Sequence, residues 1–339
     1  PPPSPPPSPP PLPPQGVFTT ASISGTVTLD TDTPTTTCKF SGAAAAIGDN
    51  RVIFAPYNSD SIGIFDAATS GYTYLDITYN ISSDGMFSGA VTAQNGLIVF
   101  VPFNSDSIGF FEPTNSSFYM YNITNYLTTS QTQCNGVSAT CSSGISPQGK
   151  FAGAAMASNG IIYFAAHNAD VPLSISIGSG PAYHSVSTYQ LPTSIQAWYV
   201  SKPSKFYGAM SSNSMMLTDP ATATTATSLT TDVIVFAPYD GDLVGFYTPS
   251  TNVWSVLNIS SLVNVDGKFR GAVSSVNGLV YLAPYSADGV MRVDVSTPTA
   301  DLVDISSSLS YDRKFAGAAC ADAAAKLIFA PAVADVVGV

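Results

Sequence analysis

The feature that most constrains the fold of this chain is a motif that recurs six times. Each copy begins with Phe-x-Gly-Ala, and the marker phenylalanines are Phe40, Phe87, Phe151, Phe206, Phe269 and Phe315. Consecutive copies are 46 to 64 residues apart. A period of this length is typical of a solenoid, an array or a propeller, so the content of one copy must decide between them.

The first copy predicts four short strands, over 40–46, 52–55, 62–66 and 72–77. The turn between the first two strands is Asn-Gly in three other copies, at Asn95-Gly96, Asn159-Gly160 and Asn277-Gly278. This dipeptide accepts the positive φ angles of a two-residue hairpin. Because no segment shows a sustained 3.6-residue apolar period, the pattern disfavours helices.

A four-stranded antiparallel unit of this size cannot bury both of its faces alone. Six such units in a ring cover one another's faces and leave few strand edges exposed. The sequence therefore predicts an all-β fold, a six-bladed β-propeller of four-stranded antiparallel blades over residues 16–339. The Gly and Ala runs that follow each marker Phe suit inner strands that crowd around an axis.

The ends of the repeat region predict how the ring closes. Residues 338–339 align with residues 63–64, in the third strand of the first copy. The segment 18–40 spans 22 residues from Phe to Phe, as the segment 65–87 does. We therefore expect residues 17–38 to supply the outer strand of the last blade. They would do so within one molecule or by donation to a neighbour, which would make a head-to-tail fibre.

The chain opens with PPPSPPPSPPPLPP, which forms neither helix nor sheet because proline fixes φ and lacks a backbone N–H. We expect residues 1–15 to be a polyproline II arm, roughly 40 Å long at about 3.1 Å per residue. The arm would be a spacer or a docking element, and a disordered linker is the alternative. It has neither the basic start nor the apolar centre of a signal peptide. Because the numbering opens on Pro1, we expect a processed or partly observed product.

Composition limits the compartment and the partners. No apolar run among the 339 residues approaches the roughly 18 that cross a bilayer, so we expect no membrane span. The net charge is −11, with only 11 Lys plus Arg. This balance argues against nucleic acid and anionic membranes as partners, since both need a cationic surface.

The four cysteines would suit two disulfides. Cys134 with Cys141 would close a small loop, and Cys38 with Cys320 would tie the first blade to the last and resist opening of the ring. Four N-glycosylation sequons begin at Asn80, Asn115, Asn122 and Asn258. Such tripeptides arise by chance in Ser/Thr-rich chains. Together with the cysteines and the low charge, they favour a secreted glycoprotein.

Two repeated polar positions are expected to meet on one face, because the loop between strands two and three emerges beside the loop that enters the next blade. The residue before the marker Phe is Lys39, Lys150, Lys205, Lys268 or Lys314, with Met86 the exception. The loop position is Asp60, Asp106, Asp170, Asp242, Asp288 or Asp335. The pattern predicts either a structural ring of Lys–Asp pairs or an annular site for a sugar or a cation near the axis.

A ring side chain stands beside the Asp loop in five copies, at Tyr57, Phe103, His167, Tyr239 and Tyr285. Sugar recognition uses aromatic faces beside polar groups, so these residues are candidates for a sugar platform. Packing between blades is the alternative interpretation.

Enzymatic interpretations have less support. The chain has two histidines, no Gly-x-Ser-x-Gly elbow, no two-His metal motif and no phosphate-binding glycine loop. Paired carboxylates for glycoside cleavage stay open, because spacing along the sequence does not give separation across a ring. An active site normally breaks the symmetry of its repeats, whereas these polar positions follow it. We therefore expect a non-enzymatic protein without a metal or cofactor.

The repeat of KF-x-GA, Asn-Gly, Ile-x-Phe-x-Pro and a terminal Asp resembles a propeller repeat of algal and other protist proteins, over about residues 17–339. Blades one, four and six lack the Asn-Gly, and blade three has Ala166 in place of the repeat Pro. The arm resembles the hydroxyproline-rich glycoproteins of green-algal walls, pherophorin-like and extensin-like proteins among them.

That resemblance implies an extracellular structural role in a wall, a matrix or a cell or flagellar surface fibre. Its partners would be further copies of itself or other matrix glycoproteins. It also implies hydroxylation of the arm prolines and O-glycosylation with short chains of arabinose and galactose, at Pro1, Pro2, Pro3, Pro5, Pro6, Pro7, Pro9, Pro10 and Pro11. A carbohydrate-binding, lectin-like propeller on a stalk is the alternative function.

Overall fold

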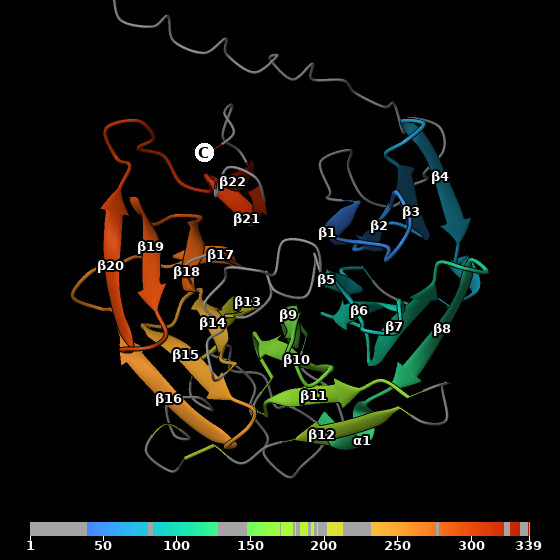
Figure 1. The fold of residues 1–339 in the computed structure, drawn as a ribbon, viewed down its shortest axis with the longest axis horizontal. Helices are drawn as coiled ribbons and strands as arrows, with labels where there is room; N and C mark the ends of the chain where they lie inside the picture. Colours follow the sequence, from blue (N-terminus) through green and yellow to red (C-terminus); the bar gives the residue numbers. More distant parts are fainter. Residues whose placement is uncertain are drawn as a thin grey trace, which may run out of the picture.

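The protein is an all-β propeller with about six blades. The computed structural model describes residues 39–80, 84–127, 148–169, 171–178, 180, 184–188, 191–192, 195, 202–212, 232–275, 278–321, 326–332 and 338. Figure 1 shows the strands as blades around a common centre, with the chain passing from one blade to the next in sequence order. No helix of these described residues is long and apolar enough to cross a membrane.

Five blades are four-stranded antiparallel sheets in which neighbouring strands follow chain order. From the inside outward they are β1 (Phe40–Ala45), β2 (Arg51–Pro56), β3 (Ser61–Asp66) and β4 (Gly71–Asp76); β5 (Phe87–Thr92), β6 (Ile98–Pro102), β7 (Ser107–Glu112) and β8 (Ser117–Asn122); β9 (Phe151–Met156), β10 (Ile161–Ala166), β11 (Leu173–Ser176) and β12 (Ser185–Thr188); β13 (Phe206–Ser211), β14 (Ile234–Pro238), β15 (Leu243–Thr248) and β16 (Val253–Asn258); and β17 (Phe269–Ser274), β18 (Leu279–Pro284), β19 (Gly289–Asp294) and β20 (Thr299–Asp304). Two one-turn helices, η1 (Thr78–Asn80) and α1 (Thr124–Leu127), follow β4 and β8. The four strands predicted for the first copy agree with β1 to β4 to within one residue at each end.

The sixth blade contains β21 (Phe315–Ala321) and β22 (Lys326–Pro331). Phe329 of β22 also bridges to Gly338, as Phe54 bridges to Gly63 in the first blade. This register confirms the predicted alignment of Gly338 with the third strand. The arm and the segment 17–38 lie outside the described residues, so the predicted closure of this blade stays a prediction.

The two predicted disulfides also stay predictions. Cys38, Cys134 and Cys141 lie outside the described residues, and Cys320 is placed only as a member of β21.

A β-bulge interrupts the inner strand of every blade between the marker Phe and the Ala of Phe-x-Gly-Ala. The glycine at this bulge has a positive φ, as at Gly208 with φ +117°. A Cβ on Gly208 would stand 2.7 Å from the Cα of Gly271 in the next blade. The marker glycine is therefore required twice, by its backbone conformation and by the close approach of the neighbouring inner strand. The expected crowding near the axis is confirmed.

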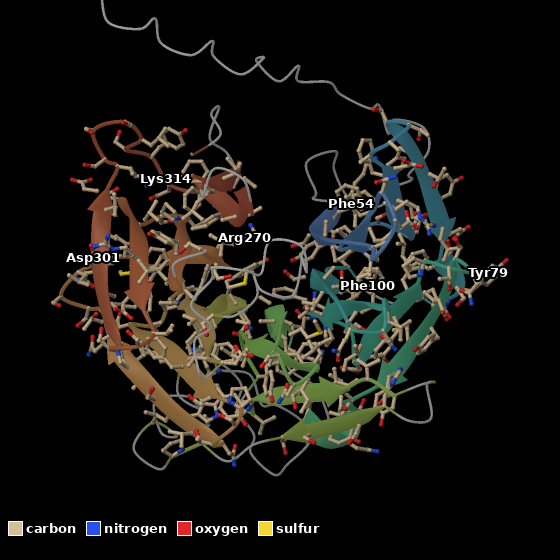
Figure 2. All side chains as sticks on the ribbon, viewed as in Figure 1. Phe54, Tyr79, Phe100, Arg270, Asp301 and Lys314 are labelled. Atoms are coloured by element: carbon tan, nitrogen blue, oxygen red, sulfur yellow. The ribbon has the colours of Figure 1, made fainter. Side chains whose placement is uncertain are left out.

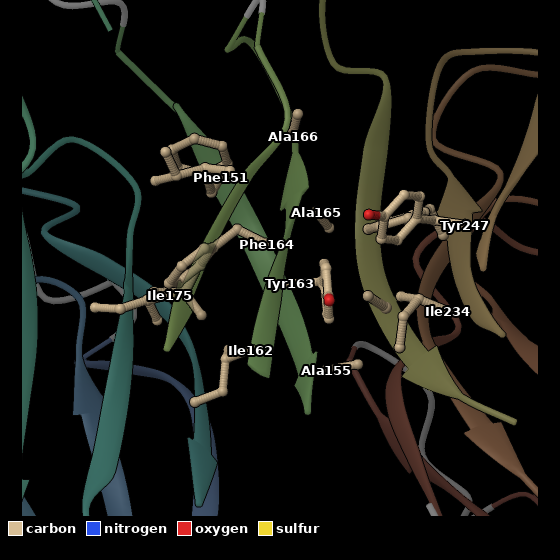
Figure 3. Close-up of a cluster of buried hydrophobic side chains, with 14 of the residues drawn as sticks. Phe151, Ala155, Ile162, Tyr163, Phe164, Ala165, Ala166, Ile175, Ile234 and Tyr247 are labelled. Atoms are coloured by element: carbon tan, nitrogen blue, oxygen red, sulfur yellow. The ribbon is translucent and has the colours of Figure 1, made fainter. Parts of the chain in front are cut away.

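The central strand β10 of the third blade is buried on both faces because its sheet lies between two others. Figure 3 shows Ile162 and Phe164 on one face of β10, and Tyr163 and Ala165 on the other. Phe164 packs against the marker Phe151, with ring centroids 5.6 Å apart. Tyr163 meets Tyr247 of the next blade at 5.2 Å. Alternating side chains thus fill two interfaces from one strand.

The Asn-Gly turns differ from the predicted two-residue hairpin. The N–H of Gly160 donates to the C=O of Ala157 at 2.9 Å, and Gly160 alone of the Asn-Gly pair has a positive φ, +78°. The N–H of Gly96 likewise donates to the C=O of Ala93, and Gly96 also has a positive φ. The connection is therefore a four-residue turn that ends in a glycine bulge. The Asn159 side chain stabilises it by accepting the N–H of Ile161 at 2.9 Å.

Candidate functional site at the propeller axis

The residue before each marker Phe connects two blades through its backbone. The N–H of Lys150 donates to the C=O of Phe103 in the preceding blade at 2.7 Å, and its C=O accepts the N–H of His167 at 2.9 Å. The same pair of hydrogen bonds is made at Met86, Lys205, Lys268 and Lys314. Backbone hydrogen bonds thus run from blade to blade around one face of the ring.

The side chains of these lysines point into the protein. Lys150, Lys205, Lys268 and Lys314 are at most 2% exposed. The Lys150 ammonium donates to the C=O of Asn104 at 2.8 Å and pairs with Asp106 at 3.0 Å. Burial lowers the pKa of Lys150 from its ordinary value, and the hydrogen bond to Asp106 opposes that change. A buried ammonium with carbonyl partners is a structural cation rather than a free ligand group.

The pairing repeats in two further blades. Lys268 lies 3.0 Å from Asp242 and Lys314 lies 3.5 Å from Asp288, and each aspartate belongs to the preceding blade. Lys205 donates to the C=O of His167 at 3.4 Å. The arrangement follows the predicted structural ring of Lys–Asp pairs more closely than an annular ligand site.

The other members of this ring are placed differently. Asp170 and Asp335 lie outside the described residues. Lys39 and Asp60 are partly buried, and Asp60 accepts a hydrogen bond from the hydroxyl of Ser61 at 3.1 Å. In the second blade Met86 occupies the lysine position and is 2% exposed, so an apolar side chain of similar length fits there.

The five predicted platform residues form a continuous belt. Ring centroids are 5.6 to 5.9 Å apart from each residue to the next, in the order Tyr57, Phe103, His167, Tyr239 and Tyr285. Each contact joins two blades, so the belt packs the blades together. Burial lowers the pKa of His167 to about 4, so its imidazole is neutral, and Nδ1 lies 3.1 Å from the C=O of Phe206. Burial likewise raises the pKa of Tyr239 to about 12.

A second set of axial residues is absent from the sequence-based candidates. The residue after the marker Phe differs from blade to blade: it is Ser41, Ser88, Ala152, Tyr207, Arg270 or Ala316. The hydroxyl of Tyr207 in the fourth blade lies 2.8 Å from that of Ser88 in the second. This contact spans the third blade, where the equivalent residue is the small Ala152. The sequence signal that could have identified these residues is that this one position varies from blade to blade while the rest of the motif is regular.

Arg270 completes this cluster. Its Nη2 donates to the hydroxyl of Tyr207 at 2.8 Å, and its Cζ stands 4.5 Å from the ring centroid of Tyr207 and 5.5 Å from that of Tyr285. Figure 2 shows Arg270 beside the centre of the ring. We name Ser88, Tyr207, Tyr239, Arg270 and Tyr285 the axial cluster. It breaks the symmetry that the lysines and aspartates obey.

The four sequon asparagines are exposed and lie around the outside of the blades. Asn80 is in η1, Asn115 is in the turn before β8, and Asn122 and Asn258 end β8 and β16. Oδ1 of Asn122 accepts the N–H of Thr124 at 2.9 Å, a bond that Asp76 and Asp304 make in other blades. The turn therefore uses Oδ1, whereas an N-linked sugar is attached to Nδ2. Among the described residues, no group of three or more His, Cys, Asp or Glu is placed to hold a metal ion.

Comparison with known proteins supports the fold and assigns no activity. No protein-family model matches the chain, and no curated protein matches it. A streptogramin B lyase structure is 15% identical with a TM-score of 0.57, and the match covers 87% of this chain and 78% of that one. The Dos1 propeller is 7% identical with a TM-score of 0.53, over 86% of this chain and 66% of that one. Hydrazine synthase of Kuenenia stuttgartiensis is 11% identical with a TM-score of 0.54, over 91% and 77%. At such identities the likeness shows the β-propeller fold alone.

Proposed function

We propose that this protein is a non-enzymatic structural glycoprotein of an extracellular wall, matrix or surface fibre. The propeller would be a rigid building block, and the proline-rich arm a glycan-coated spacer. The observation that carries the proposal is the exposure of all four sequon asparagines, Asn80, Asn115, Asn122 and Asn258, around the outside of the blades. Sugars attached there would cover the outer surface without disturbing any contact between blades.

The use of the repeated charged groups also supports a structural role. The buried lysines bind carbonyl groups and aspartates of the preceding blade, so they stabilise interfaces between blades. A catalytic lysine would instead need its ammonium group within reach of a substrate. Partners would be further copies of this chain or other matrix glycoproteins.

Mass spectrometry of the protein purified from its natural source tests this proposal. We expect the intact mass to fall when N-glycans are removed enzymatically. Peptide mapping should find hydroxyproline glycans on residues 1–11 and glycans on the four sequons. Electron microscopy of the same material should show repeating particles. An unmodified, monomeric protein would contradict the proposal.

A lectin-like function is the second candidate, because the aromatic belt and the axial cluster bring ring faces and hydroxyl groups together at the axis. This combination is the one that sugar sites use. A glycan array and a calorimetric titration with arabinogalactan test it. Soluble monomers that bind glycans would favour this function over the structural one, and an array without binding would exclude it.

A further inference from the structure

We propose that the axial cluster is a binding site for an anionic sugar, a saccharide that carries a carboxylate or a sulfate group. Arg270 would bind the anionic group, and the hydroxyls of Tyr207 and Ser88 would bind the sugar hydroxyls beside it. The inference stands on the contacts of the cluster and does not depend on the structural role proposed above.

The first argument is the lack of a counter-ion at Arg270. Elsewhere, buried or exposed cations pair with aspartates, as Lys150 does with Asp106 and Arg292 does with Asp301. In the part of the chain that the structure describes, no carboxylate forms an ion pair with Arg270; its neighbours are the tyrosine rings. A guanidinium that is partly removed from water without a carboxylate is stabilised when a bound anion takes that place.

The second argument is the number of free donor groups. A guanidinium has five N–H donors and no acceptor, and one contact, to the Tyr207 hydroxyl, is formed among the described residues. The fully buried polar side-chain atoms without a partner in those residues are the Tyr72 hydroxyl and Trp254 Nε1. Nε and Nη1 of Arg270 are not among them, so these two nitrogens are not fully enclosed, and they can bind an oxyanion through two parallel hydrogen bonds.

The third argument is that the arginine is already held in place. The rings of Tyr207 and Tyr285 lie against the guanidinium, and Tyr207 is itself bound to Ser88, which lies 3.1 Å from the hydroxyl of Ser41. Binding then requires little further ordering of long side chains, which is a main cost of association. The chain as a whole has a net charge of −11, so general electrostatic attraction would not bring an anion here. The local site must supply the specificity.

The surroundings of the arginine indicate a sugar rather than a simple anion. Hydroxyl groups of tyrosine and serine donate and accept hydrogen bonds, which matches the hydroxyl groups of a saccharide. Aromatic ring edges and faces beside them provide the apolar surface that sugar C–H groups cover. An uronic acid and a sulfated sugar share this chemistry and differ in the anionic group alone.

Isothermal titration calorimetry with four probes tests the proposal: methyl glucuronide, galactose 6-sulfate, methyl glucoside and inorganic sulfate. We expect one or both anionic sugars to bind, and the neutral glucoside and free sulfate to bind at least about tenfold more weakly, since each lacks one part of the recognition. Binding of the glucuronide alone would identify a carboxylate site, and binding of the sulfated sugar alone a sulfate site. Equal binding of glucoside and glucuronide, or sulfate binding as tightly as both sugars, would overturn the proposal, as would no binding of any probe.

Two variants with the same change of charge show whether Arg270 is responsible. Arg270→Gln should weaken binding about tenfold or more, because it removes a charge-assisted hydrogen bond. The matched control is Arg292→Gln, since Arg292 is exposed on an outer part of a blade and paired with Asp301; it should leave affinity unchanged. Tyr207→Phe, which removes one hydroxyl, should weaken binding several-fold. Equal effects of both arginine variants would point to total charge and contradict the site.

A modification experiment on the unaltered protein covers the case in which Arg270→Gln does not fold. Phenylglyoxal reacts with accessible arginines, and peptide mapping then gives the rate at each one. Methyl glucuronide or galactose 6-sulfate should slow the modification of Arg270 and leave that of Arg292 unchanged. Equal rates at Arg270 with and without the sugars would overturn the proposal. This result would leave the glycoprotein proposal intact, because that depends on the mass of the natural protein.

Discussion

At the scale of single residues, the buried lysines show how a charged side chain becomes part of an interface. Lys150 is 1% exposed while its partner Asp106 remains 51% exposed, so the ammonium end bears most of the desolvation. The carbonyl of Asn104 and the carboxylate of Asp106 offset that cost. Lysine is suited to this position because its long apolar stem fills the gap between blades before the charge is reached.

We predict that Lys150→Ala lowers the free energy of unfolding by about 3 kcal/mol, because it leaves a cavity and an unpaired carbonyl. Lys150→Met should cost less than about 1.5 kcal/mol, because it keeps the volume, as Met86 does in the second blade. Urea denaturation measures both, with the exposed Lys202 replaced by Met as the control. Equal losses for Ala and Met would show that the charge, not the packing, is what the interface needs.

The lowered pKa of His167 gives a pH dependence with a defined sign. Burial lowers this pKa from 6.5 to about 4, so between these pH values the unfolded chain binds a proton that the folded chain does not. Stability should therefore fall as the pH falls from 6.5 to 4 and level off below, with a contribution of about 3 kcal/mol from this residue.

Replacement of His167 by Phe, the residue at the same position in the second blade, should remove this contribution. Urea midpoints at pH 7 and pH 4.5 should then differ less in the variant than in the natural protein. Some dependence will remain, because burial also lowers the pKa of His184 and side-chain hydrogen bonding lowers that of Asp294. Parallel pH curves for the two proteins would contradict the assignment.

Part of the candidate site could be predicted from the sequence. Topology predicted that the lysine of one blade lies beside the aspartate of the blade before it, and Lys268 and Asp242 do so. It did not indicate how deeply the lysines are buried, because burial depends on how closely the blades pack. Tyr207 and Arg270 were missed because the bulge at the marker motif breaks the strand alternation, so the direction of the side chain before Gly208 and Gly271 could not be inferred.

At the scale of the elements, the inner strand and its bulge are the unit on which the ring is built. Strand positions were predictable because apolar alternation and turn residues mark them independently of their partners. The geometry of the Asn-Gly turn could not be predicted, since the same dipeptide occurs both in a two-residue hairpin and in a turn with a glycine bulge. The one-turn helix α1 has too few residues for any periodic pattern.

Substitution of the marker glycine separates backbone strain from contact between strands. Gly208 and Gly317 have nearly the same φ, +117° and +115°. A Cβ on Gly208 would lie 2.7 Å from the Cα of Gly271, whereas a Cβ on Gly317 would meet no atom of the described residues within 4 Å. Both alanine variants should lose about 1–3 kcal/mol from strain, and Gly208→Ala should lose at least about 2 kcal/mol more from the clash. Chemical denaturation measures the difference, and equal losses would mean that the inner strands separate freely.

At the scale of the whole molecule, the junction between the last and first blades differs from the others. In five blades a Cβ on the marker glycine would stand 2.6 to 3.0 Å from the glycine of the next blade, and among the described residues Gly317 has no such neighbour. Within the described residues, the sixth blade consists of β21, β22 and the bridge at Gly338, and none of these residues forms its outermost strand. We therefore expect a further segment at this junction, and the sequence predicts that residues 17–38 supply it.

Two truncated chains test this closure. Removal of residues 1–16 should leave the thermal unfolding midpoint unchanged, because the arm contributes no predicted strand. Removal of residues 1–38 should lower the midpoint by at least about 3 °C, since loss of an edge strand that covers apolar surface removes about 2 kcal/mol or more. If the strand is donated between molecules, the chain that keeps residues 17–38 should also sediment as oligomers and the shorter chain as monomers. Identical midpoints and identical sedimentation of the two chains would show that the ring is stable without this segment, and the last blade would then be completed in another way.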